Sequence, residues 1–264
     1  QDATDKQALK GQKLNNAGFP GHSHSVVSGL SLENNFWNER IQNVAGIKGY
    51  YYVIEAEEDD ENRMQQLTDD YADNKDFGYS ENLRIKLIDQ LSIIDQFAVK
   101  GGYQHSLRFP TREEIFGDGM YVQCAPNLKP EKSDNFTAGT ELDLRQIPLL
   151  LKLHLEFNWF YMLMDDRIYW NNYAAVPRPY YNSVGTKTTG FEIDAAIDVN
   201  EYISLSYNLT KQDAESREAD LAYGIAEGLT VPNIPTFYMN FGAEFHIGDL
   251  LFRDDFFKLY WLVN

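Results

Sequence analysis

The side chains that could do chemistry in this sequence fall into a few short clusters. His22 and His24 stand two residues apart, on one side of an extended chain, where imidazoles could bind a transition metal. The acidic run 55–61 and the pair Asp165–Asp166 offer the hard oxygen ligands that Ca²⁺ prefers. The run lacks the Asp-x-Asp-x-Asp-Gly spacing of a calcium loop, and such clusters are usually solvated loop residues. We therefore assign no metal site to them.

Signatures of catalysis are missing from the sequence. It contains no Gly-x-Ser-x-Gly, no His-Glu-x-x-His, no phosphate-binding loop and no zinc spacing. Its single cysteine, Cys124, excludes an internal disulfide, and we expect an inert loop thiol at this position. The sequence therefore indicates neither catalytic residues nor a cofactor.

The charge balance narrows the choice of partner. The 264 residues include 40 Asp and Glu against 23 Lys and Arg, a net charge of −17. Nucleic-acid binding needs clustered basic residues, so this balance argues against a nucleic-acid partner. No apolar run approaches the roughly 18 residues of a transmembrane helix, and Gln1 begins a polar stretch rather than a signal segment. These features fit either a cytosolic protein or a mature or trimmed piece of an exported one, and the strand pattern favours the second.

Alternating residues predict the elements that must position these groups. Segments 136–145 and 149–163 put Phe136 and Trp159 on an apolar face and Glu141 and Glu156 on a polar face. A period of two is that of a β-strand. Many segments exceed ten residues, whereas soluble strands average about 5–6 and tilted membrane strands need about 9–11. In all, about ten segments alternate: 26–36, 41–54, 79–88, 97–108, 136–145, 149–163, 191–198, 203–210, 237–247 and 256–264.

The connections between these segments alternate in length. Structureless loops longer than about 12–15 residues are uncommon in compact domains, yet here they recur at every second connection. Outer-membrane barrels have this plan, with short periplasmic turns and long extracellular loops. The short connections are 37–40, 89–92, 146–148 and 199–201, and the long ones are 55–78, 109–134, 165–182 and 212–235.

Charges in the middle of the polar faces indicate the environment of the sheet. They suit a water-filled or polar lumen, with the apolar faces turned to lipid. The sequence therefore predicts an all-β, transmembrane antiparallel β-barrel in a bacterial outer membrane. Tyrosines and tryptophans near strand ends fit an interfacial girdle, or equally the ordinary β-propensity of aromatic residues. These are Tyr50, Tyr51, Tyr52, Trp159, Tyr161, Tyr180 and Tyr181.

Several motifs in a fixed order resemble the barrel of TonB-dependent outer-membrane receptors. Residues 101–119 (GGYQHSLRFPTREEIFGDG) hold its Arg-x-Pro-Thr strand end and Phe-Gly-Asp-Gly loop. Residues 127–142 (NLKPEKSDNFTAGTEL) hold its Leu-Lys-Pro-Glu-x-Ser segment and a strand with a central glycine. Further matches lie in 165–168, 182–197 and 231–242. The positions concerned are Arg108, Pro110, Thr111, Glu114, Phe116, Gly117, Gly119, Asn127, Leu128, Pro130, Glu131, Ser133, Gly139, Asp165, Asp166, Ile168, Asn182, Gly185, Lys187, Gly190 and Glu192.

The resemblance implies a fold and a function. The family's barrel has 22 strands, filled by an N-terminal plug that contacts TonB, so residues 1–264 are expected to be about ten strands of it, without the plug. The implied function is active uptake of a scarce nutrient: a ferric siderophore, cobalamin, haem or an oligosaccharide. The partners would be this ligand, outer-membrane lipid and, through the plug, the TonB complex.

Two sets of residues are candidates for the site of such a receptor. Rigid barrels present ligands on loops, where aromatic rings and Arg could clamp a ligand: Arg112, Trp170, Tyr173, Arg178, Tyr180 and Tyr181. Charges on the polar faces would line the lumen and satisfy the polar surface of the plug: Lys100, Arg108, Glu141, Lys152, Glu156, Glu192 and Asp194.

Two other functions stay open on the sequence alone. A complete ten-stranded outer-membrane protease or lipase could use His105 with Asp165 and Asp166 near the outer rim. A soluble carbohydrate-binding or adhesive β-protein would also show alternating strands. Activity on peptides or lipids would indicate the first, and solubility without detergent the second.

Overall fold

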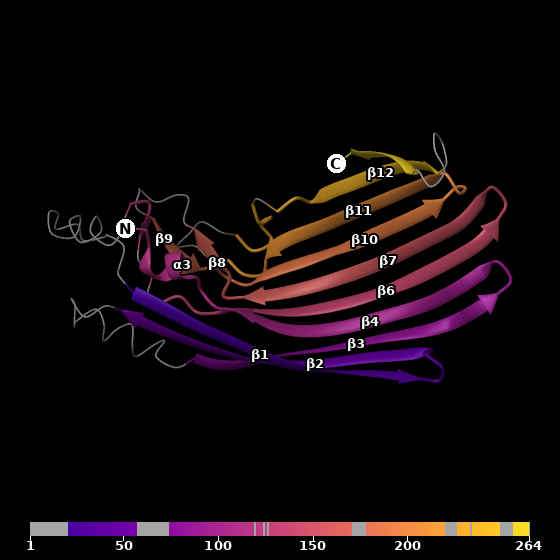
Figure 1. The fold of residues 1–264 in the computed structure, drawn as a ribbon. Coiled ribbons are helices and arrows are strands. Elements are labelled where there is room, and N and C mark those ends of the chain that lie inside the picture. Colours follow the sequence, from indigo (N-terminus) through magenta and orange to yellow (C-terminus); the bar gives the residue numbers. More distant parts are fainter. Residues whose placement is uncertain are drawn as a thin grey trace.

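The main element of the computed structural model is one antiparallel sheet of ten strands, which lie side by side in the order of the sequence (Figure 1). The structure describes residues 21–56, 74–118, 120–123, 125, 127–170, 178–219, 226–232, 234–248 and 256–263. The ten strands are β1 (Gly21–Phe36), β2 (Ile41–Ala56), β3 (Asn74–Leu91), β4 (Ile94–Arg108), β6 (Glu131–Ile147), β7 (Leu150–Asp165), β10 (Thr186–Asp198), β11 (Ile203–Ser216), β12 (Phe237–Gly248) and β13 (Phe256–Val263).

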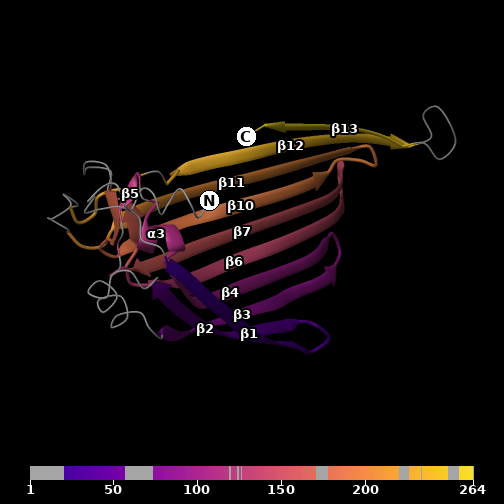
Figure 2. The same ribbon diagram turned by 60° about the vertical axis from the view of Figure 1, so that its left-hand side comes forward.

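This architecture confirms the predicted fold class. Each strand pairs with its neighbours along the chain, as in an up-and-down barrel. The sheet is twisted and curved but open, with β1 and β13 at its two edges (Figure 2). It therefore has the form of a segment of barrel wall. Within the described residues, no helix is long and apolar enough to cross a membrane.

The predicted alternation of short and long connections is also confirmed. β6 and β7 are joined by Pro148 and Leu149 alone, because Pro presets the first turn position and Leu149 adopts a positive φ of 76° at the second. Residues 92–93 join β3 and β4, and residues 199–202 join β10 and β11. These turns lie at one end of the sheet, and the long connections lie at the other (Figure 1).

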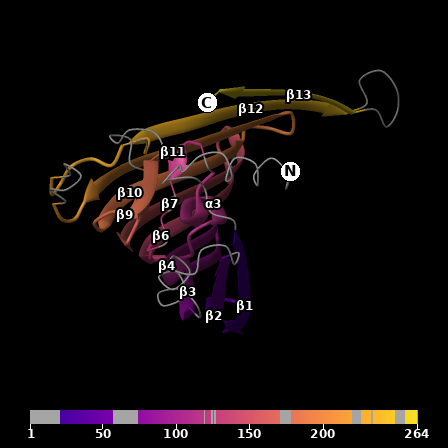
Figure 3. The same cartoon turned by 90° about the vertical axis from the view of Figure 1, so that its left-hand side faces the viewer.

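A small loop layer covers the sheet at its long-connection end (Figure 3). It consists of α3 (Arg112–Phe116), β5 (Val122–Gln123), β8 (Ile168–Trp170) and β9 (Arg178–Asn182). Thr111 and Glu114 form a capping box at the start of α3, which satisfies backbone donors at this helix end. The apolar side chains of the layer are buried together: Ile115, Phe116, Val122, Leu128 and Ile168.

The loop layer corrects the expectation of an aromatic girdle at residues 50–52. Tyr52 is buried, its ring stacks on Phe109 at 4.8 Å between centroids, and its hydroxyl donates to the Pro110 carbonyl at 2.8 Å. Only Tyr51 of the three shares a face with the exposed Val26. Alternation along β2 sends neighbouring tyrosines to opposite faces, so Tyr52 anchors the loop layer instead.

The register of the sheet separates two faces. Direct pairs such as Phe136–Tyr161 and Phe157–Ile193 share the apolar face, and pairs such as Glu141–Glu156 and Asp194–Asn208 share the polar face. In a closed barrel with a lipid-facing exterior, the polar face is the inner one.

Candidate functional site

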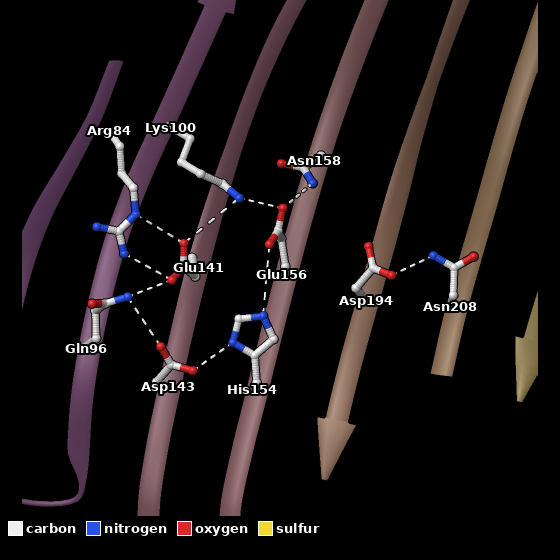
Figure 4. Close-up of polar contacts among 10 residues, drawn as sticks. All are labelled: Arg84, Gln96, Lys100, Glu141, Asp143, His154, Glu156, Asn158, Asp194 and Asn208. Carbon is white, nitrogen blue, oxygen red and sulfur yellow. Dashed lines mark hydrogen bonds and ion pairs between the residues drawn. The ribbon is translucent and has the colours of Figure 1, made fainter. Parts of the chain in front are cut away.

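A network of charged side chains crosses four adjacent strands on the polar face (Figure 4). Arg84 on β3 donates two hydrogen bonds to Glu141 on β6, from Nε at 3.2 Å and Nη2 at 3.0 Å. The Lys100 ammonium on β4 pairs with Glu156 on β7 and lies 4.0 Å from Glu141. A bidentate guanidinium–carboxylate pair is among the stronger contacts of this kind. The network therefore ties β3, β4, β6 and β7 together through their side chains.

The network continues toward the short-turn end of the sheet. Gln96 donates to Glu141 at 2.6 Å and to Asp143 at 3.3 Å. His154 Nδ1 lies 2.7 Å from Asp143 Oδ1. Ligand atoms of Glu141, Asp143 and His154 lie within 4.8 Å of one another, a spacing at which a metal ion could be held. Because Arg84 and Lys100 already neutralise Glu141, a cation would have to compete with two fixed positive charges, and we assign none.

The charge balance of this network is negative. Arg84 and Lys100 are its two cations, whereas Glu141, Asp143 and Glu156 are three carboxylates. On the next strand Asp194 adds a fourth carboxylate, which accepts a hydrogen bond only from the Asn208 amide at 2.6 Å among the described residues. The polar face is thus built to receive cationic or hydrogen-bond-donating groups.

A groove of about 440 Å³ lies on the polar face beside the network. At the groove the polar face of β6 carries Gly139, which has no side chain, between Thr137 and Glu141. A Cβ on Gly139 would lie 2.2 Å from the Asn158 Oδ1 atom and 2.6 Å from the Phe157 carbonyl oxygen. The groove is lined by Gln42, Val44, Asn82, Leu83, Arg84, Lys100, Gly101, Thr137, Ala138, Gly139, Asn158, Phe160 and Glu192.

The structure brings together some of the lumen residues predicted from the sequence. Lys100, Glu141 and Glu156 are joined in the network, Glu192 lines the groove, and Asp194 lies on the adjacent strand. Lys152 is exposed near the short-turn end, where it pairs in register with Asp198.

Arg108 lies apart from the other predicted lumen residues. At the last position of β4, its Nε donates to Glu131 at 2.6 Å and its Nη1 to Glu114 at 3.1 Å. It therefore anchors the loop layer. Six residues of the polar network and its neighbours were not among the candidate site residues, although the same alternation places them on this face: Arg84, Gln96, Asp143, His154, Asn158 and Asn208.

Three of the predicted loop residues meet in the loop layer. Trp170 and Tyr180 are paired across β8 and β9, and the Arg178 guanidinium lies 5.5 Å from the centroid of the Trp170 ring. Trp170 Nε1 and Arg178 Nε are buried and have no hydrogen-bond partner among the described residues. Burial, with the nearby Glu113 and Glu114 carboxylates, raises the pKa of the Tyr180 hydroxyl. This side of the β8–β9 pair therefore offers donors rather than acceptors.

The remaining predicted residues are scattered. Tyr181 packs edge-on against Tyr169 on the opposite side of the β8–β9 pair, where Arg167 lies 5.9 Å from the Tyr169 ring. Arg112 is exposed at the start of α3. Tyr173, Cys124 and most of the acidic run lie outside the described residues.

The residues of the enzyme alternative are not assembled. His105 Nδ1 lies 2.7 Å from Asp134 Oδ1. Asp165 instead pairs with Arg217 at 2.7 Å, and Asp166 lies 4.0 Å from Lys129. The arrangement does not join the histidine to the two aspartates that the sequence suggested.

Residues 59–262 match the family model described as "TonB dependent receptor-like, beta-barrel". No curated protein is similar enough in sequence to be matched. Among solved structures, the copper transporter OprC superposes with a TM-score of 0.59 at 18% identity, over 86% of this chain and 32% of that one.

Two further solved structures share the fold. The siderophore receptor PirA from Acinetobacter baumannii has a TM-score of 0.58 at 16% identity, over 86% of this chain and 32% of that one. The Serratia marcescens hemophore receptor HasR, a double mutant in complex with HasA and heme, has a TM-score of 0.62 at 13% identity, over 90% of this chain and 44% of that one. The chain thus spans about a third to less than half the length of these proteins.

Proposed function

The chain belongs to the TonB-dependent receptor-like β-barrel family, and from this premise we propose that it forms part of the wall of an outer-membrane receptor for active nutrient uptake. Energy would come from TonB, acting through a plug domain. The single observation that carries the proposal is the division of the sheet into one predominantly apolar face and one charged, grooved face. A transport barrel needs lipid on one side and a polar path on the other.

The family consists of transport receptors, which counts against a complete barrel enzyme. The exposed apolar face, with Phe157 and Trp159 among its members, counts against a soluble carbohydrate-binding protein. In this orientation the short turns are periplasmic, and the long connections with the loop layer are extracellular.

The loop residues would make the first contact with the ligand. OprC is named a copper transporter, PirA a siderophore receptor and HasR a hemophore receptor. For this chain we propose a ligand of the same range: a ferric siderophore, cobalamin, haem or an oligosaccharide. Arg112, Trp170, Arg178, Tyr180 and Tyr181, together with Tyr173, would bind it from the extracellular side.

The polar network would face the plug. Lys100, Glu141, Glu156, Glu192 and Asp194 line or adjoin the groove, and their surplus of carboxylates complements cationic groups of a plug domain. Lys152 would extend this surface toward the periplasm, and Arg108 would hold the loop layer above it. The contact with TonB belongs to the plug and not to these strands.

Uptake by the full-length receptor tests this function. The receptor would be expressed in cells that lack their own receptors, with and without TonB, and offered ferric siderophores, cobalamin, haem and oligosaccharides in turn. We expect uptake of one class, abolished by loss of TonB. Uptake that persists without TonB, or uptake of none of the four classes, would contradict the proposal.

A further inference from the structure

The apolar face is not uniformly apolar. On β6, β7, β10, β11, β12 and β13, the charged side chains of this face lie toward the long-connection end, among them Asp134, Lys211 and Asp213, and the positions nearer the short turns carry none. Examples at paired positions are Leu142 with Leu155, Ile193 with Leu209, and Phe245 with Leu259. This part of the face suits acyl chains without modification.

On β1 to β4 the same face carries a polar stripe that crosses the middle of the strands and ends at Asp134 of β6. Asn34 of β1 pairs directly with Asn43 of β2. Glu81 of β3 pairs with Ala45, two residues nearer the long-connection end than Asn43, and with Tyr103 of β4 on its other side. His105 lies two residues beyond Tyr103 and pairs with Asp134 of β6. Each polar group therefore lies beside or beyond the previous one toward the extracellular end.

The stripe runs along the barrel axis rather than along the strands. Ile41, the first residue of β2, pairs with Ile85, yet β3 continues to Leu91 before its turn. Each short turn therefore lies farther from the long-connection end than the turn before it. This is the stagger expected of strands tilted by about 35–45° to the barrel axis. A line that steps toward the long-connection end on successive strands therefore follows the membrane normal.

Acyl chains offer no hydrogen-bond partner to the part of the stripe nearer the short turns, which is Asn34, Asn43 and Glu81. Glu81 is exposed, and its carboxylate accepts one long hydrogen bond of 3.4 Å, from the Asn43 amide. The Asn34 side chain has no hydrogen-bond partner among the described residues. By contrast, the three residues nearer the long connections form hydrogen bonds with one another: Tyr103 donates to Asp134 at 2.6 Å, and His105 lies 2.7 Å from Asp134. A carboxylate facing acyl chains is unfavourable, so a polar neighbour is needed at Glu81.

We propose that this stripe, Asn34, Asn43, Glu81, Tyr103, His105 and Asp134, is the contact surface for a second copy of the receptor. Two barrels that stand side by side in a membrane touch along a line parallel to the membrane normal, and the stripe follows such a line. It also carries amide and hydroxyl donors together with a carboxylate acceptor. Across a two-fold axis parallel to the stripe, groups at equal depth meet their own copies, and the Asn34 and Asn43 amides can bond themselves because an amide both donates and accepts. The Asn43 amide, which lies beside Glu81, can also donate to the Glu81 carboxylate of the other copy.

Photocrosslinking in intact outer membranes tests the second copy. In the full-length receptor, Leu83 is replaced by photoreactive benzoylphenylalanine, because it adjoins Glu81 and pairs with Asn43. Phe157 on β7 is the matched control, since Leu83 and Phe157 are 41% and 43% exposed on the same face. With two differently tagged copies in one cell, we expect an adduct that carries both tags from Leu83 and none from Phe157.

A substitution in the stripe completes the test. Glu81→Leu should lower the yield of the two-tag adduct several-fold. If the Glu81→Leu receptor does not fold, Asn43→Leu is used in its place, with the same expected result. Adducts only with lipid, adducts only with a different protein, or a yield unchanged in the folded variant would each overturn the proposal. Nutrient uptake does not enter this readout, so its outcome is independent of the transport function.

Discussion

At the scale of single residues, Leu149 occupies a backbone conformation that disfavours its side chain. It has a φ of 76° in the two-residue turn after Pro148 and is 92% exposed, so it contributes no packing. A left-handed conformation costs a non-glycine residue about 1–2 kcal/mol, and glycine removes this cost. The gain in stability is smaller than this, because glycine loses more backbone entropy on folding than leucine does. We expect Leu149→Gly to stabilise the barrel by roughly 0.5–1 kcal/mol.

The measurement is the urea midpoint of the full-length receptor in lipid vesicles. Leu149→Ala is the control, because alanine retains the same backbone penalty, and it should leave the midpoint unchanged. An equal gain from both variants would show that loss of an exposed apolar side chain, rather than relief of the turn, is responsible.

Asp118 organises the loop that follows α3. Its Oδ1 accepts hydrogen bonds from the backbone N–H groups of Met120, Tyr121 and Val122 at 2.8, 2.7 and 2.8 Å. Burial opposes ionisation, but these donors outweigh it and lower the pKa of Asp118 below its usual value of 3.8. A lowered pKa means stabilisation that is full above the usual value and is lost as pH falls through the folded-state value.

Hydrogen exchange of these three amides checks the pH dependence. Their protection in the wild-type receptor should be constant at neutral pH and decline as the pH falls below about 4. In Asp118→Asn, protection should be lower at neutral pH and insensitive to acid. A wild-type protection that stays flat down to pH 2 would contradict the role given to the carboxylate.

At the scale of elements, Gly139 on the polar face of β6 leaves room for the groove. Because a Cβ on Gly139 would come 2.6 Å from the Phe157 carbonyl oxygen, backbone rather than a flexible side chain must move to admit it. Overpacking of this kind costs about 1–3 kcal/mol, and Gly139→Ala should lower the urea midpoint accordingly. Gly101→Ala, on the apolar face of β4, is the control for an added methyl group without a clash: a Cβ there meets its nearest atom, the Thr137 carbonyl oxygen, at 3.9 Å. Equal losses from both variants would rule out the steric cause.

The Arg84–Glu141 pair couples β3 to β6, although β4 lies between them. Their side chains are 20% and 15% exposed, so solvent screens the pair only partly. We expect a coupling of about 1 kcal/mol or more in a double-mutant cycle with Arg84→Met and Glu141→Gln. The urea midpoints of the four receptors give this value. Additive effects would show that the contact between Arg84 and Glu141 contributes nothing to stability, and that Lys100 and Gln96 are the partners that matter for Glu141.

At the scale of the whole molecule, the sheet has a direction in the membrane. If the long connections are extracellular, Glu227 is outside the cell and Glu201 is periplasmic, because Glu227 lies between β11 and β12 and Glu201 in the turn between β10 and β11. We expect a membrane-impermeant maleimide to label Glu227→Cys on intact cells, and to label Glu201→Cys only after the cells are broken. A cysteine-free receptor is the background. The reverse labelling pattern would show that the sheet has the opposite orientation in the membrane, with the loop layer on the periplasmic side.

The sequence by itself determined the strands, their two faces and the alternation of turns and loops. These are local properties: a period of two within one segment decides which side chains share a face, whatever the neighbours. Motifs from Arg108 to Ser133 and beyond also indicated the family. Strand ends were the weak point, since Glu131–Asn135 belongs to β6 although its polar residues lack the alternation of 136–145.

Only the tertiary structure decided which residues meet across strands. Glu141 bonds Arg84, 57 residues away, and His105 bonds Asp134 rather than the aspartates at 165 and 166. Such contacts depend on register, and register follows from the length of every intervening turn and from the pairing of whole strands. The same cause placed Tyr52 under the loop layer and aligned Asn43, Glu81 and Asp134 into one stripe. A shift of one residue in any pairing would turn a strand over, and that information is held by the assembled sheet.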